Sequence, residues 1–96
     1  MITATWNNEV IAESNKTIML EGNHYFPPDA IRADVLRPSS TTSNCPWKGT
    51  ARYYSVEVAG ATNKDAAWYY ADPSDKAKEI KNYVAFWKGV SVREAA

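Results

Sequence analysis

The alternation of apolar and polar residues along the chain is typical of short β-strands. The clearest strand spans residues 50–58, TARYYSVEV, because β-branched and aromatic residues dominate it. Residues 66–71 and 83–87 are also rich in aromatic and apolar side chains, and the second of these segments is apolar on both faces. We therefore expect these three segments to be the central strands of a sheet.

The first third of the chain predicts a β-meander. Two short apolar segments, 3–6 and 9–13, are separated by Asn7-Asn8, a dipeptide suited to a tight hairpin turn. A third strand is expected at 17–21, and a fourth short one at 24–26, just before a diproline.

Helical and irregular segments are predicted between these strands. Residues 29–36 are expected to form one or two helical turns after the diproline. Asp72 followed by Pro73 predicts the start of a helix of about two turns. Residues 37–44, RPSSTTSN, read as a loop because they are small, rich in hydroxyl groups and without apolar periodicity. Residues 91–96 read as a frayed tail.

The predicted fold class is mainly β, in a single domain covering residues 1–96. A chain of 96 residues is long enough for one modest core. We expect a small barrel or a tent-like pair of packed sheets, with one or two short helices.

The balance of charged residues limits the kinds of binding partner that we expect. Eleven basic and eleven acidic side chains leave no net charge, so we expect neither nucleic acid nor a membrane surface as a partner. The opening residues show neither a basic stretch nor an apolar run, so we expect no secretory signal and a cytoplasmic location. The sequence does not predict an oligomeric state.

The scarcity of cysteine and histidine argues against a structural metal site. The chain has one of each, Cys45 and His24, and a closed tetrahedral zinc site needs four such ligands. We expect no bound metal and no cofactor.

The same two residues are the candidates for catalysis. Lys48 lies three residues after Cys45 and would favour its thiolate form, whereas a buried structural thiol is the alternative. His24 suits general acid–base chemistry, and the alternative is a loop histidine hydrogen-bonded to the backbone.

The segment CPWKG at 45–49 points to a binding site. Pro46 fixes its own φ, Gly49 suits a backbone with positive φ, and Lys48 would present a cation to an anionic ligand. Aromatic side chains on the neighbouring strands would form the walls of a pocket. The predicted ligand-binding residues are Trp47, Lys48, Arg52, Tyr54, Trp68 and Tyr70.

Several motifs together resemble one known family. EGNHYFPPD, CPWKGTARYY, DAAWYY and YVAFW follow the order and spacing of domain-of-unknown-function family 427, over about residues 3–92. The resemblance implies a small β fold similar to the tent-like barrels of the Mss-four class. It also carries a nucleotidyltransferase-like label, although the chain has no D-x-D pair and no glycine-rich phosphate loop.

The leading functional hypothesis is a small cytoplasmic domain that binds an anionic or aromatic small molecule in an aromatic-lined pocket near CPWKG. One alternative is an enzyme, acting through Cys45 or by nucleotidyl transfer. The other alternative is a protein-interaction module that uses exposed aromatic side chains.

Overall fold

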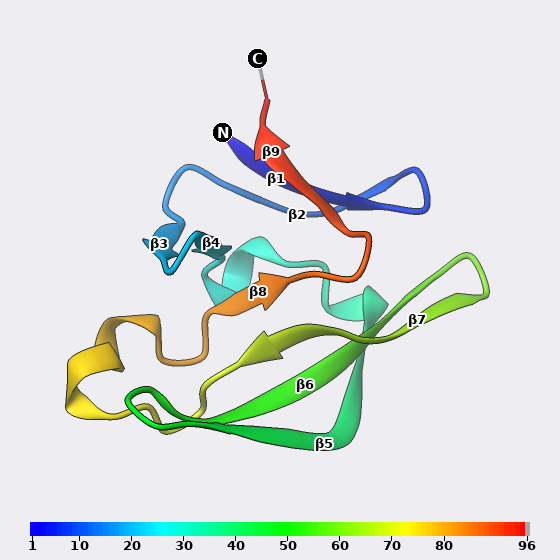
Figure 1. The fold of residues 1–96 in the computed structure, drawn as a ribbon. Helices are drawn as coiled ribbons and strands as arrows, with labels where there is room; N and C mark the ends of the chain where they lie inside the picture. The colour runs from blue at the N-terminus through cyan, green and yellow to red at the C-terminus, as the bar shows by residue number, and fades with distance from the viewer. Residues whose placement is uncertain (96) are drawn as a thin grey trace.

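Antiparallel hairpins build most of the fold (Figure 1). The computed structural model describes residues 1–95, in which nine strands form three antiparallel sheets joined by short 3₁₀ helices. The predicted mainly-β class is confirmed. The sheets pack against one another, and the pairings within residues 1–95 do not close a barrel.

The N-terminal sheet contains β1 (Ile2–Trp6), β2 (Glu9–Ser14) and β9 (Ser91–Glu94), in the order β2-β1-β9. Asn7 and Asn8 form the predicted turn with φ values of 52° and 66°, a conformation that asparagine tolerates better than most residues. The prediction of a frayed tail after residue 90 is wrong, because Ser91–Glu94 pairs with β1. That partner strand lies at the other end of the chain, so no local pattern reveals the pairing.

A separate hairpin comprises β3 (Ile18–Leu20) and β4 (Asn23–Tyr25). Glu21, at the turn, has a φ of 51°. The strands expected at 17–21 and 24–26 are therefore confirmed, and the acidic side chain of Glu21 lies at the tip of the hairpin.

The main sheet has the order β5-β6-β7-β8, with β5 (Leu36–Cys45), β6 (Gly49–Val58), β7 (Ala61–Tyr69) and β8 (Val84–Phe86). The predicted central strands 50–58 and 66–71 correspond to β6 and β7, which are inner strands. The prediction that 83–87 is central is wrong, since β8 ends the sheet. Its two-sided burial has another cause, since Val84 and Phe86 belong to the first hydrophobic core of the protein and Ala85 to the second. Phe26 and Val84 also exchange backbone hydrogen bonds of 2.8 and 2.9 Å, which cover the open edge of β8.

The predicted loop at 37–44 is wrong, because these residues belong to β5, the outer strand of the main sheet. Pro38 is tolerated there because an edge strand leaves part of its backbone unpaired. Pairing is irregular between Pro38 and Thr42 and regular on both sides of them. The strand forms because β6 supplies partners, although its own side chains are mostly exposed and lack apolar periodicity.

Three short 3₁₀ helices replace the one or two helices expected. Helices η1 (Pro28–Ala30) and η2 (Ala33–Val35) occupy the segment predicted to form helical turns. Helix η3 (Asp75–Ile80) has about the two turns expected, in 3₁₀ form, but it begins later, with Ser74 rather than Asp72 at its N-cap position. Ser74 does not cap the helix with its side chain, because its hydroxyl donates to the carbonyl of Trp47 instead.

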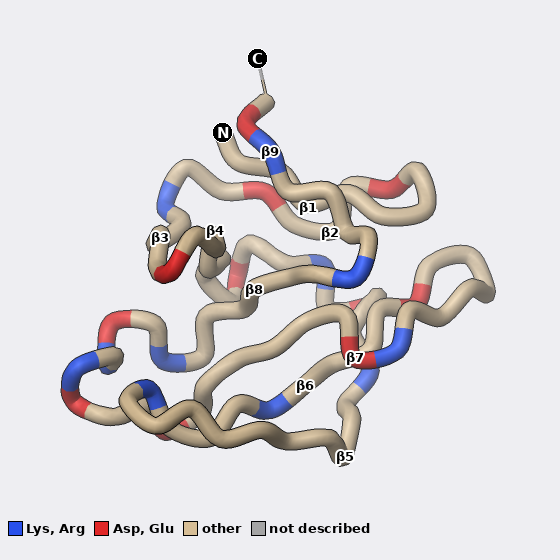
Figure 2. Tube along the Cα trace, viewed as in Figure 1, with Lys and Arg blue, Asp and Glu red and all other residues tan. Residues whose placement is uncertain are grey.

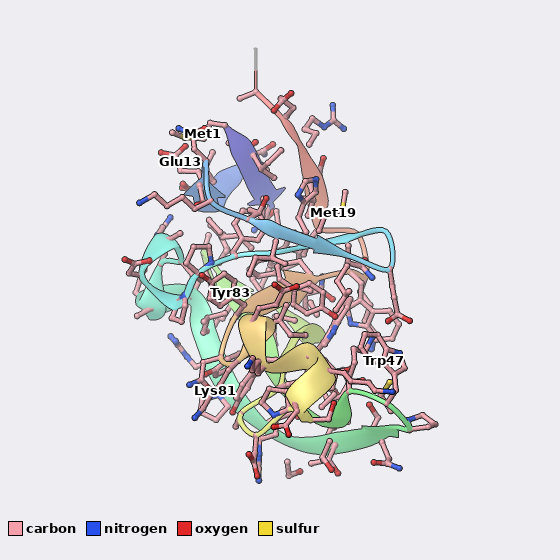
Figure 3. All side chains as sticks on the ribbon, turned by 90° about the vertical axis from the view of Figure 1, so that its left-hand side faces the viewer. Met1, Glu13, Met19, Trp47, Lys81 and Tyr83 are labelled. Carbon is pink, nitrogen blue, oxygen red and sulfur yellow. The ribbon has the colours of Figure 1, made fainter. Side chains whose placement is uncertain are left out.

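The two faces of the main sheet bury different cores, since alternate side chains of a strand point to opposite faces. On one face, Val56 and Ala67 join a first core with residues of the N-terminal sheet and of η2. On the other face, Ala51 and Tyr70 join a second core with β4 and η3. Figure 3 shows the segment of η1 and η2 and the labelled Trp47 on opposite sides of the molecule.

Candidate functional site

The predicted site residues fall into separate groups. Five of them gather at the second core, where the β3–β4 hairpin meets the β5–β6 turn: Cys45, Trp47, Lys48, Trp68 and Tyr70. Arg52 is exposed to solvent, and Tyr54 packs against the first core on the opposite face of the sheet. The structure therefore does not bring all six predicted ligand-binding residues together.

Lys48 is a buried cation, with 7% of its surface exposed. Its ammonium forms an ion pair and hydrogen bond with the Glu21 carboxylate at the tip of the β3–β4 hairpin. The ammonium nitrogen also lies 5.4 Å from the ring centroid of Trp47 and 5.6 Å from that of Tyr70. These distances are within the range of cation–π attraction. Glu57, a carboxylate on the neighbouring strand β6, pairs with Arg37 instead of Lys48.

The surroundings of Lys48 keep it protonated. Burial alone would lower the pKa of Lys48, but the hydrogen bond with Glu21 and the nearby oxygens of Tyr25 and Tyr70 outweigh burial and raise it. The same hydrogen bond lowers the pKa of Glu21. Lys48 is thus a positive charge that holds an anion, and it does not suit the role of a general base at neutral pH.

The β5–β6 turn that carries Lys48 packs against the segment that precedes η3. The backbone N–H of Ser74 donates to the carbonyl of Lys48 over 2.9 Å. Gly49 has the expected positive φ, 115°, and an added Cβ there would lie 3.3 Å from the carbonyl oxygen of Asp72. Glycine is therefore favoured here for two reasons: it adopts the positive φ without strain, and its lack of a Cβ lets the segment before η3 approach closely.

The two candidate catalytic residues lie on different strands. Cys45 is a half-buried free thiol packed against the second core. His24, on β4, has its Nδ1 2.9 Å from the hydroxyl oxygen of Thr17. No hydrogen bond joins Cys45 to His24 in the part of the chain that the structure describes, and no group of three or more His, Cys, Asp or Glu side chains there could hold a metal ion.

A cavity of about 390 Å³ opens on the opposite face of the main sheet, beside Tyr54. Tyr54 stacks on Tyr69, with ring centroids 4.7 Å apart and planes 21° from parallel. Burial and the neighbouring Tyr69 phenol raise the pKa of Tyr54, so its hydroxyl stays neutral and can donate a hydrogen bond. Around the tyrosine pair, the lining consists of Pro28, Ile31, Ala33, Leu36, Asn82 and Val84.

The cavity lining contains no charged side chain. A second, larger hollow of about 560 Å³ lies between β2 and η1 and includes Glu13, Asp29 and Arg32. Of the six predicted ligand-binding residues, Tyr54 lines the first cavity and the other five line neither. Figure 2 shows basic and acidic positions interspersed over most of the trace, whereas β5 is almost free of them.

A buried carboxylate that the sequence did not suggest joins β5 to β7. Asp65 lies in an irregular stretch of β7 with a φ of 55°, and its Oδ2 accepts a hydrogen bond of 2.8 Å from the Thr41 hydroxyl. The neighbouring hydroxyl groups of Ser39 and Thr41 lower the pKa of Asp65. Its backbone carbonyl accepts a bond of 2.6 Å from the Trp87 indole.

Sequence reasoning missed Glu21, Tyr69, Asn82 and Asp65. Three of these, Glu21, Asn82 and Asp65, have positive φ without being glycine. No periodicity signals that conformation, because it results from turns and irregular pairings fixed by the fold. The sequence placed Tyr69 in an aromatic strand without indicating a role for it, because its contact with Tyr54 depends on the register of β6 and β7.

Together these features define a small, mainly-β domain with a buried cation on one face of its main sheet and a tyrosine-walled cavity on the other. The chain belongs to the family described as domain of unknown function DUF427, whose model matches residues 1–95. The resemblance seen in the sequence is thereby confirmed. A search of curated proteins finds no match to the chain. Within residues 1–95, no helix is both long and apolar enough to cross a membrane.

Proposed function

We propose that the protein binds a small, planar, largely apolar molecule in the cavity beside Tyr54 and Tyr69. The observation that carries the proposal is a cavity of about 390 Å³ walled by a stacked tyrosine pair. Ligand cavities commonly span roughly 300–1,000 Å³ and are lined mainly by apolar and aromatic groups. A cavity at the lower end of that range suits a molecule of one or two rings.

The sequence analysis suggested an anionic or an aromatic ligand, and the uncharged lining of this cavity favours the aromatic one. An anion placed there would lose its hydration without meeting a cation. A neutral ring would instead bury apolar surface against Ile31, Leu36 and Val84, and would contact a tyrosine face.

The anionic ligand remains a second candidate, at Lys48. A buried ammonium beside Trp47 and Tyr70 would bind a carboxylate or phosphate group. Glu21 already occupies the position of that anion, so binding there requires Glu21 to move away. The half-exposed Glu21 side chain is free to do so at little cost in desolvation.

The enzymatic alternatives are testable on the same protein. Chemistry at Cys45 predicts an activity that Cys45→Ser abolishes while the melting temperature stays unchanged. Nucleotidyl transfer predicts a Mg²⁺-dependent transfer from a radiolabelled nucleotide. A binding role in the cytoplasm predicts neither activity.

Titration with indole and with benzoate, followed by amide chemical shifts in NMR, separates the two binding sites. Indole is a neutral ring and benzoate an anionic one. We expect indole to shift residues lining the cavity and Tyr54→Leu or Tyr69→Leu to weaken its binding at least about fivefold. Tyr53→Leu is the matched control, because Tyr53 precedes Tyr54 on β6 and packs against the second core.

Two outcomes would contradict the proposed site. In the first, indole shifts no cavity residue in the unmodified protein. In the second, the Tyr53 variant loses binding as strongly as the Tyr54 variant. If benzoate shifts residues around Lys48 and Lys48→Met removes those shifts, the anionic candidate replaces the aromatic one.

A further inference from the structure

Asn82 brings an unpaired amide to the cavity. It lies between η3 and β8 with a φ of 62°, and its backbone N–H donates to the carbonyl of Tyr70 over 2.9 Å. This left-handed conformation is one that asparagine adopts more readily than other residues except glycine. The side chain is exposed and lines the cavity, and within residues 1–95 its amide forms no hydrogen bond.

The Asn82 amide differs from the rest of the cavity lining in its hydrogen-bonding groups. The other lining residues are apolar side chains and two tyrosines. A primary amide carries a donor N–H₂ and an acceptor C=O side by side, whereas a phenol offers a single O–H. A cyclic amide, whose N–H and C=O point the same way, complements it with two parallel hydrogen bonds.

We infer that the ligand is a planar cyclic amide, with Asn82 selecting its N–H and C=O edge and the tyrosine pair contacting its ring. This inference rests on the proposed binding function and adds the chemical class of the ligand. A ring without the amide edge would still bury its surface in the cavity but would displace water from Asn82 without replacing its hydrogen bonds. Loss of such a pair of hydrogen bonds weakens binding about tenfold.

Two probes with the same ring skeleton test the inference. 2-Quinolone carries the cyclic amide edge, and quinoline lacks it. We expect the unmodified protein to bind 2-quinolone about tenfold more tightly than quinoline, with shifts at cavity residues for both. Asn82→Gly should bring this ratio close to one, because it weakens the binding of 2-quinolone more than that of quinoline.

The choice of variants keeps the fold intact. Glycine adopts the positive φ of residue 82 without strain, so Asn82→Gly removes the amide and preserves the backbone. Asn8→Gly is the matched control, because Asn8 also has a positive φ, of 66°, and lies in the β1–β2 turn. It should retain the preference of the unmodified protein.

The outcomes of this experiment distinguish a failure of the inference from a failure of the proposed binding function. If both probes bind the cavity equally well, or if Asn82→Gly keeps the tenfold ratio, the assignment of a cyclic amide is overturned and the binding function stands. If neither probe shifts a cavity residue, the binding function itself is overturned, and the inference with it.

Discussion

Gly49 gives the sharpest test of how the β5–β6 turn is built. Its φ of 115° lies well beyond the small left-handed region near +60° that other residues tolerate. A Cβ at this position would lie 3.3 Å from the carbonyl oxygen of Asp72 and 3.6 Å from the Cα of Pro73. Gly49→Ala therefore introduces both backbone strain and a contact with backbone atoms that cannot rotate away.

The magnitude follows from comparison with a second glycine. Gly60, in the β6–β7 turn, has a φ of 81° and no atom within 4 Å of an added Cβ. Gly60→Ala should cost about 1 kcal/mol, the usual penalty for placing a side chain in a left-handed turn. Gly49→Ala should cost about 3 kcal/mol, because its backbone region is less favourable and its Cβ is crowded.

Urea or thermal unfolding of the two variants measures the difference. For a domain of this size, about 3 kcal/mol corresponds to a fall in melting temperature of roughly 15 °C, against roughly 5 °C for Gly60→Ala. Equal destabilisation of the two variants would refute the reasoning, since it would show that the contact with Asp72 and the larger φ add nothing.

Three further predictions concern single side chains. Glu21→Gln should lower the urea midpoint more than Lys48→Met does. Glu21→Gln leaves a buried ammonium without its carboxylate, whereas Lys48→Met leaves only a half-exposed carboxylate in water. The reverse order of the two midpoints would contradict the ion pair between Lys48 and Glu21. Asp65 has a lowered pKa in the folded protein, so its stabilising contribution is complete above the unfolded pKa and is lost as the pH falls through the folded pKa. Unfolding midpoints measured from about pH 5 down to about pH 2 should therefore fall more steeply for the unmodified protein than for Asp65→Asn, and parallel curves would count against this role. Cys45→Ser should cost about 1 kcal/mol in urea unfolding and leave indole and benzoate binding intact, whereas loss of binding without loss of stability would make the thiol part of the site.

Strand positions were predictable where the information is local. β6 and β7 were recognisable from their β-branched and aromatic residues, and the Asn7-Asn8 turn from the preference of asparagine for positive φ. β5 and β9 could not be recognised, because their own residues are mostly polar and show no alternation of apolar and polar side chains. An edge strand forms when a neighbour supplies hydrogen-bonding partners, and that information lies in β6 and β1.

The sequence by itself determined the class of the fold, the family and the presence of a tight, glycine-dependent turn at CPWKG. The fold class and the turn follow from residues close together in the chain, such as Gly49 beside Lys48, and the family follows from the order of several short motifs. Only the tertiary structure decided the partner of Lys48, because Glu21 precedes it by 27 residues and approaches through the docking of one hairpin on another. It likewise decided that Tyr54 faces a cavity on the side of the sheet away from Lys48. Side-chain alternation assigns residues to opposite faces of a strand, but the elements that pack on each face determine which face is left with a hollow.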